Sequence, residues 1–159
     1  MAKFIVAEGL DTYIKSLEEL QKDTEPGMKY ALYFGAEELA NAVRTEIGTI
    51  PVSSKNHSGK RYIDTAQRDG LLAGLGISAM KNESGFVNVR IGFDGYNSKV
   101  TDNYPKGQPN SLIARSIVSG TSFRSKNNFI GRAVSKSKAK AERAMSDAFD
   151  RYVKGIMDK

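Results

Sequence analysis

The chain has 159 residues, of which 40% are hydrophobic and 26% are charged, and its net charge is +6. This composition predicts a single globular domain over residues 1–159 and excludes an intrinsically disordered chain. Because the sequence contains no cysteine, it also excludes disulfides, thiol nucleophiles and thiolate metal sites.

Charge is unevenly distributed along the chain. The net charge is −4 over residues 1–50, +3 over residues 51–110 and +7 over residues 111–159. A chain with an acidic front and a basic back can attract copies of itself head to tail, or present its basic part to an acidic partner. A basic helix face that is simply solvated is the alternative that this pattern leaves open.

The N-terminal third predicts a short strand at Lys3–Ala7 followed by two antiparallel helices. The first helix is capped by Asp11 and ends at Lys22–Thr24, and the second begins at Pro26 and ends at Gly48. Apolar residues recur at spacings of three and four along both: Leu10, Tyr13, Ile14, Leu17, Leu20, Met28, Leu32, Leu39, Val43 and Ile47. The N-terminus does not resemble a signal peptide and no stretch is long and apolar enough for a membrane span, so we expect a soluble protein.

Two long polar loops are expected at about residues 49–63 and 94–110, and both are expected to be flexible. The first contains the only histidine, His57, which in a polar loop is more often solvated than catalytic. Between the loops, Asp64 is expected to cap a short helix, and alternating apolar residues over 75–93 predict a β-hairpin.

The stretch that follows the second loop is expected to set a strand and a helix at a fixed angle. The apolar, β-branched run Leu112–Val118 predicts a strand. Gly120 and Thr121 then form a candidate hinge, and a basic arm containing Arg124 follows. Phe129 is expected to act as an aromatic staple at the start of the last helix.

The last helix is expected to be long, spanning about residues 127–157. Val134 and Ile156 belong to its apolar stripe, together with Ala141, Met145, Ala148, Phe149 and Tyr152. Basic residues cluster in its first half, where the helix dipole disfavours cations. We therefore expect an anionic partner, or the acidic front of a neighbouring copy, to face them.

These elements predict an α+β fold: a small antiparallel β-sheet packed by an N-terminal helical pair and a long C-terminal helix. The sequence contains no phosphate-binding loop, zinc-ligand spacing or nucleophile elbow, and Asp94 and Asp102 lack the spacing of a calcium loop. We expect no catalytic residue, no cofactor, no metal and no enzymatic activity. If the protein works by shape alone and transforms no substrate, the two loops should not converge on a deep, polar-lined cavity.

Four segments carry a family resemblance, in their order and spacing: Ser58–Ser78 (SGKRYIDTAQRDGLLAGLGIS), Val89–Tyr96 (VRIGFDGY), Tyr104–Ser122 (YPKGQPNSLIARSIVSGTS) and Asn127–Lys136 (NNFIGRAVSK). Together they resemble the small head–tail joining, or tail-completion, proteins of long-tailed double-stranded DNA phages. The resemblance covers roughly residues 51–159, and the N-terminal helices fit by pattern only.

The resemblance implies a structural virion protein, made in the host cytoplasm, that forms a ring of about six copies at the neck or at the top of the tail. Its partners would be copies of itself, head connector or adaptor proteins, and tail tube or terminator proteins, with passing double-stranded DNA not tightly bound and no membrane. Candidate interface residues are Arg124, Phe129, Arg132, Lys136, Lys140, Glu37 and Glu38.

A basic nucleic-acid-binding module is the alternative function, supported by the net charge and by the cations of the last helix. No recognition-helix motif and no pattern of stacking aromatic residues accompanies them.

Overall fold

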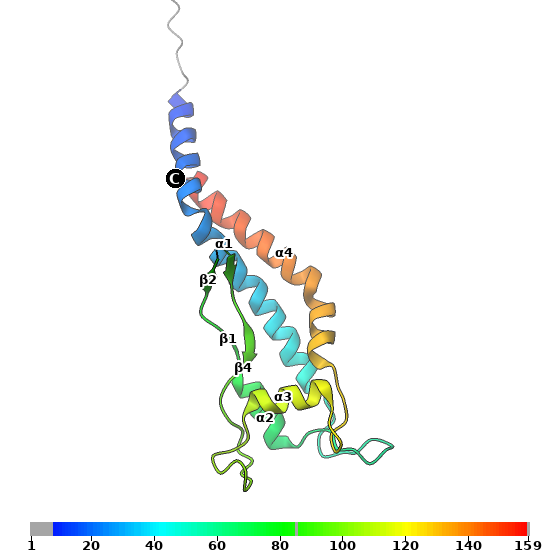
Figure 1. Ribbon diagram of the computed structural model, residues 1–159. Helices are drawn as coiled ribbons and strands as arrows, with labels where there is room; N and C mark the ends of the chain where they lie inside the picture. The colour runs from blue at the N-terminus through cyan, green and yellow to red at the C-terminus, as the bar shows by residue number, and fades with distance from the viewer. Residues whose placement is uncertain (1–7, 85, 159) are drawn as a thin grey trace, which may run out of the picture.

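The computed structural model describes residues 8–84 and 86–158, so the strand expected at Lys3–Ala7 lies outside the described residues. The elements are α1 (Glu8–Gly48), α2 (Thr65–Gly74), β1 (Leu75–Ile77), β2 (Lys81–Glu83), β3 (Phe86–Asn88), β4 (Ile91–Phe93), α3 (Asn110–Ser119) and α4 (Phe129–Met157). The described residues form four helices and two small antiparallel sheets, which confirms the expected α+β class. In Figure 1, α1 and α4 run side by side, and α2, α3 and the long loops gather at one end.

The expected pair of N-terminal helices is wrong, because α1 is one continuous helix of 41 residues with Pro26 inside it. Proline has no N–H to donate to the carbonyl of Lys22, and it costs a helix interior about 3 kcal/mol. Packing against α4 spans this point, since a Cβ on Gly27 would lie 2.7 Å from the Tyr152 ring. Tertiary contact therefore carries the helix past a residue that local preference treats as a boundary.

Small residues let α1 and α4 approach closely in antiparallel directions. Gly27 faces Tyr152, and Gly35 faces Met145, where an added Cβ would lie 2.5 Å from the Met145 Cγ. Buried alanines continue the seam on both helices: Ala31, Ala36, Ala40, Ala133 and Ala148. The residue pairs also show that α1 extends beyond the end of α4, because position 27 already faces position 152 (Figure 1).

The long C-terminal helix is confirmed. The Asn128 side chain caps α4 by accepting a hydrogen bond from the Gly131 N–H at 3.1 Å. Ala148 and Ile156 are buried as expected, but Val134 is 43% exposed, so its place in the apolar stripe is wrong.

The expected β-hairpin is confirmed, in two short ladders. Its base pairs β1 with β4, with Leu75 opposite Phe93, and its tip pairs β2 with β3, with Glu83 opposite Phe86. The base packs against the helices, whereas Phe86 at the tip is 78% exposed.

The strand expected at Leu112–Val118 is wrong, because this segment forms helix α3. Its buried residues, Asn110, Ile113, Ala114 and Ile117, recur at spacings of three and four. That period belongs to a helix that buries one face, and tertiary packing outweighs the β-branched composition. Gly120 ends α3 with a φ of +73°, a backbone conformation that glycine adopts without strain.

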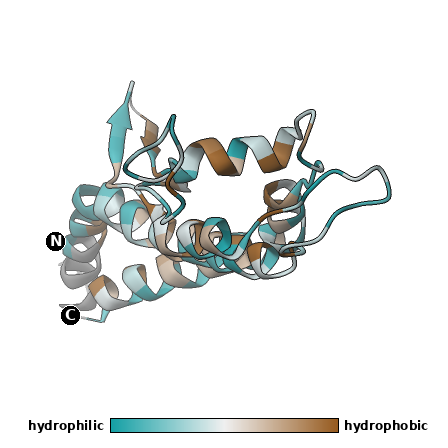
Figure 2. Ribbon diagram, turned by 90° about the horizontal axis from the view of Figure 1, so that it is seen from below, coloured by the Kyte–Doolittle hydropathy of each residue, from teal (hydrophilic) through white to brown (hydrophobic). Residues whose placement is uncertain are grey.

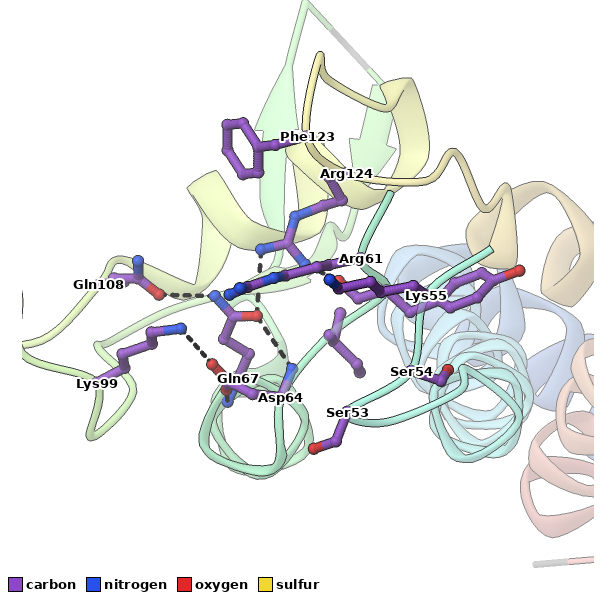
Figure 3. Close-up of a pocket in the computed structure, with 12 residues that line it drawn as sticks. Ser53, Ser54, Lys55, Arg61, Asp64, Gln67, Lys99, Gln108, Phe123 and Arg124 are labelled. Carbon is purple, nitrogen blue, oxygen red and sulfur yellow. Dashed lines mark hydrogen bonds and ion pairs between the residues drawn. The ribbon is translucent and has the colours of Figure 1, made fainter. Parts of the chain in front are cut away.

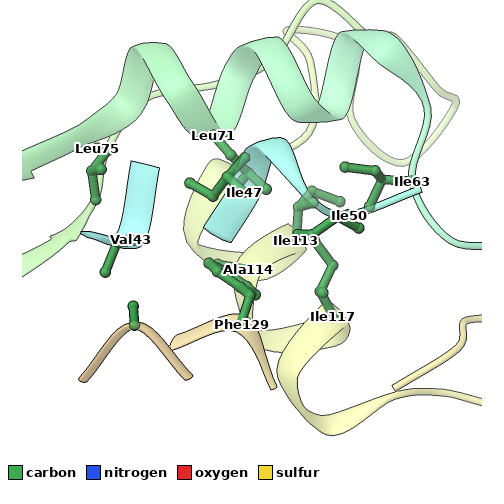
Figure 4. Close-up of a cluster of buried hydrophobic side chains, with 11 residues drawn as sticks. Val43, Ile47, Ile50, Ile63, Leu71, Leu75, Ile113, Ala114, Ile117 and Phe129 are labelled. Carbon is green, nitrogen blue, oxygen red and sulfur yellow. The ribbon is translucent and has the colours of Figure 1, made fainter. Parts of the chain in front are cut away.

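One hydrophobic core lies where these helices meet at the loop-rich end (Figure 4). It takes Val43 and Ile47 from α1, Leu71 from α2, Ile117 from α3 and Phe129 from α4. Phe129 and Leu71 are fully buried. Figure 2 shows apolar bands in α3 and long loops that are largely hydrophilic. The polar loops therefore lie at the edge of the hydrophobic core.

Candidate functional site

The two long loops converge on a polar pocket of about 420 Å³ at this end of the molecule (Figure 3). The first loop, the N-terminus of α2, the second loop and the segment after α3 all line it. The lining residues are Ser53, Ser54, Lys55, Arg61, Tyr62, Ile63, Asp64, Gln67, Lys99, Gln108, Phe123 and Arg124.

Backbone hydrogen bonds join the first loop to the segment after α3. The Arg61 N–H donates to the Phe123 carbonyl at 3.0 Å, and the Ser125 N–H donates to the Arg61 carbonyl at 2.8 Å. At the tip of the loop, the Asn56 side chain accepts from the backbone of Ser58 and Lys60. The loop thus follows a hydrogen-bonded path along the wall of the pocket.

The second loop is organised around Asn97, which is 4% exposed. Its side-chain oxygen accepts from the Lys99 N–H at 2.9 Å and from the Gln108 N–H at 3.3 Å. Gly107 lies directly against it, since an added Cβ would lie 1.9 Å from the Asn97 carbonyl oxygen. This close approach brings Lys99 and Gln108 to the pocket.

The N-terminus of α2 supplies the polar centre of the pocket. Asp64 caps the helix, as expected, by accepting from the Gln67 N–H at 2.8 Å, and the Gln67 side chain accepts from the Asp64 N–H at 3.3 Å. Gln67 is 3% exposed, donates to the Gln108 side chain at 2.8 Å and accepts from Arg124 at 3.1 Å. This capping box therefore connects both loops to Arg124.

Both oxygens of the Asp64 carboxylate are occupied. Its Oδ1 accepts from Gln67, and its Oδ2 pairs with the Lys99 ammonium. Burial raises the pKa of Asp64, but the hydrogen bonds from Lys99 and Gln67 outweigh burial and hold the pKa below its usual range. Asp64 is thus a structural anion at neutral pH.

Arg124 is buried in the wall of the pocket, with 7% of its surface exposed. Its Nη1 donates to the Tyr62 carbonyl at 2.6 Å and its Nη2 donates to the Gln67 side chain, and both of these acceptors are neutral. Its Nε is buried without a hydrogen-bond partner. Burial lowers the pKa of this guanidinium, and the charge of Asp64 opposes that effect.

The two loops converge on this pocket, which contradicts the expectation that they share no polar-lined cavity, so docking by shape alone does not account for the whole molecule. The charged lining groups of the pocket are four cations and a single carboxylate, Asp64, which is already engaged. His57 is exposed and is not among the lining residues. Within residues 8–84 and 86–158, no three acidic or histidine side chains gather to hold a metal ion. The arrangement favours binding of an anion.

The basic residues at the start of α4 face carboxylates of the same chain. Arg132 and Lys136 both bind Glu46, at 2.7 and 2.5 Å, and Lys140 binds Glu38 at 2.7 Å. For these three of the five cations in the first half of α4, the expected acidic partner is therefore α1 of the same chain. Glu37, the remaining acidic candidate, is exposed on α1.

The remaining candidate residues make contacts within the fold and do not form an exposed interface. Phe129 is a core residue with no exposed surface, and Arg124 belongs to the pocket. At the candidate hinge, the Thr121 N–H donates to the Arg124 carbonyl at 3.0 Å, and the Arg124 N–H donates to the Thr121 hydroxyl at 2.9 Å. Gly120 and Thr121 thus form a closed turn between α3 and the pocket.

Sequence reasoning did not single out Gln67, Lys99 or Gln108. The spacing of Asp64 and Gln67 is that of a capping box, which was a readable signal for Gln67. Lys99 and Gln108 reach the pocket through the path of a loop, and no local pattern marks them.

Comparison with known proteins adds no relative: no family model, no curated protein and no solved structure matches the chain. In the part of the chain that the structure describes, no helix has an apolar stretch long enough to cross a bilayer.

Proposed function

We propose that this protein is a structural component of a tailed phage particle, which joins head to tail or completes the tail as a ring of about six copies. The proposal is supported first by the resemblance of four sequence segments to head–tail joining and tail-completion proteins. Copies of the chain, connector proteins and tail tube or terminator proteins are its partners, and the neck or the top of the tail is its place.

The observation that carries the proposal is that these four segments fold as one unit. They contribute α2 with β1, then β4, then α3 with Gly120, and finally the start of α4. Three of the segments contribute Leu71, Ile113, Ile117 and Phe129 to the same core, and Phe93 of the fourth packs against it. A chain that shares a domain with this family is expected to carry such segments in the same order and to pack them together in space.

The shape of the molecule suits ring assembly. A ring needs heterologous contacts, in which one face of a subunit meets a different face of the next. The N-terminal part of α1 projects beyond the end of α4 and is available for such a contact (Figure 1). Leu17 on this projection is 42% exposed, and its neighbours Glu18 and Glu19 are exposed as well. The loop-rich end lies at the other end of the molecule and is free to meet a different neighbour.

The ion pairs between α4 and α1 weaken the nucleic-acid alternative. Five cations between Arg132 and Arg143 favoured it, and three of them, Arg132, Lys136 and Lys140, bind carboxylates of α1. Cations neutralised within the chain contribute less to phosphate binding than free ones.

The molar mass of the protein in solution separates the two functions. Sedimentation at 50 mM and 500 mM salt, with the neighbouring connector or tail-tube protein present and absent, should show ring-sized assemblies that weaken with salt. A 20-base-pair DNA duplex should not bind with micromolar affinity at 150 mM salt. Tight duplex binding that falls steeply with salt, with no assembly under any of these conditions, would support the alternative instead.

A further inference from the structure

The pocket at the loop-rich end carries an excess of positive charge. Lys55, Arg61, Lys99 and Arg124 line it, against the single carboxylate of Asp64. Because Lys99 already binds Asp64, three cations remain without a carboxylate partner among the lining residues. The electrostatic potential in the pocket therefore favours an anion.

Two hydrogen-bonding groups in the pocket wall are buried without partners. They are the Nε of Arg124 and the hydroxyl of Ser54, and both residues line the pocket. Buried polar groups are paired in the great majority of native structures, so the unpaired Arg124 Nε indicates a missing partner. The Ser54 hydroxyl lies on the far side of the pocket and points away from Arg124 (Figure 3), so one ligand group does not reach both. A guanidinium N–H donates hydrogen bonds, and an oxyanion is a strong acceptor for it.

The buried position of Arg124 strengthens this argument. Its two hydrogen-bond acceptors, the Tyr62 carbonyl and the Gln67 amide, are neutral, so only the charge of Asp64, which is not hydrogen-bonded to it, offsets its own. A buried cation without a hydrogen-bonded anion is costly, and an incoming oxyanion would reduce that cost. Phe123 stands at the edge of the same pocket and is 64% exposed, which offers an apolar surface beside the charged one.

We propose that this pocket binds a carboxylate carried by an aspartate or glutamate side chain of a partner protein. Only the identity of the partner as a protein of the particle rests on the proposed function. Arg124 would donate to the carboxylate, Lys55 and Arg61 would surround it, and Phe123 would contact the aliphatic stem of the acidic residue.

A protein carboxylate fits this pocket better than a DNA phosphate. A duplex is a rigid rod with phosphates along its outside, so it meets cations that are spread along an exposed face. Arg124 is 7% exposed and lies in the wall of a pocket, where a group on a narrow, flexible stem can reach it. Acidic side chains have such a stem.

Nuclear magnetic resonance on the isolated protein tests the proposal. Sodium acetate is titrated at constant ionic strength against sodium chloride while the Arg124 Nε–H signal is followed. We expect acetate to move this signal with a saturable curve in the millimolar range, and chloride to leave it in place. Lys55→Gln should weaken acetate binding by about twofold to fivefold, the loss of one exposed cation beside the ligand. Lys126→Gln, an exposed lysine outside this pocket, should leave binding unchanged.

An Arg124 signal that acetate moves no more than chloride does would overturn the proposal. So would a 12-base-pair duplex that moves the signal at micromolar concentration while acetate does not. If acetate binds but particles remain complete without the protein, the proposed function is refuted and the proposed anion site is not. The absence of acetate binding in a protein that particles do require would refute the pocket alone.

Discussion

Arg132 on α4 and Glu46 on α1 are joined by a hydrogen bond of 2.7 Å between Nε and Oε2, although they are 86 positions apart in the sequence. Lys136 binds the other oxygen of the same carboxylate. Glu46 is 3% exposed, so this cluster lies in the seam between the two long helices. It fixes the start of α4 against the end of α1, next to the core that supports the loops.

Glu46→Gln should destabilise the protein by about 1–2 kcal/mol. The amide keeps the size of the side chain but removes the charge that Arg132 and Lys136 share, and both cations are partly exposed, which moderates the loss. The free energy of unfolding in urea measures the change. Glu37→Gln, on the exposed face of the same helix, should change it by less than about 0.5 kcal/mol. Equal effects of both substitutions would contradict a special role for the seam carboxylate.

The contribution of Glu46 should depend on pH with a definite sign. Hydrogen bonds from Lys136 and then from Arg132 lower the pKa of Glu46 in the folded protein. A lowered pKa stabilises the fold above the unfolded value of about 4.3, and this stabilisation is lost as the pH falls through the folded value. The difference in unfolding free energy between the native protein and Glu46→Gln should therefore be equal at pH 7 and pH 5, and should shrink below about pH 4. A difference that stays the same from pH 7 down to pH 3 would mean that the pKa is not lowered.

The close contact of α1 with α4 predicts opposite outcomes for one substitution at two helical glycines. Gly35→Leu should destabilise the protein by about 1–2 kcal/mol, because its Cβ would lie 2.5 Å from Met145. Gly155→Leu should be neutral or stabilise by about 0.5–1 kcal/mol, because nothing lies within 4 Å of its Cβ and leucine favours helix more than glycine does. Thermal unfolding of the two variants gives the comparison, and a Gly35→Leu variant as stable as the native protein would show that the seam is looser than described.

Two glycines with positive φ separate backbone strain from steric contact. Gly59 has a φ of +75° with open space around it, so Gly59→Ala should cost about 1 kcal/mol from strain alone. Gly107 has a φ of +98° and lies against the Asn97 carbonyl, so Gly107→Ala should cost about 2–3 kcal/mol and displace Lys99 and Gln108 from the pocket. Urea unfolding and the amide signals of the second loop measure these effects. Equal costs at the two positions would argue against close packing of that loop.

The fold could be predicted from the sequence where a pattern is local and strong. The cap at Asp64, the hairpin over residues 75–93 and the long last helix were all readable, because capping residues, alternation and a 3.6-residue period act over short distances. The errors fell where packing overrides local preference. Pro26 indicated a boundary that the contact with α4 overrides, and the β-branched residues of Leu112–Val118 obscured a helical spacing of buried positions.

The candidate site was less predictable, because its residues are brought together by the backbone paths of two long loops. Arg124 was identified as basic and important, but a surface role was expected for a side chain that is buried. Its contacts with Tyr62 and Gln67 are 62 and 57 positions away in the sequence. Likewise, the expected acidic partner of the α4 cations exists, but it belongs to the same chain.

Electron microscopy of particles produced after deletion of this gene tests the central claim most directly. If the protein joins head to tail or completes the tail, DNA-filled heads and separate or incomplete tails should accumulate, and a copy of the gene supplied in trans should restore joined particles. Particles that remain complete and infectious without the gene would contradict the account.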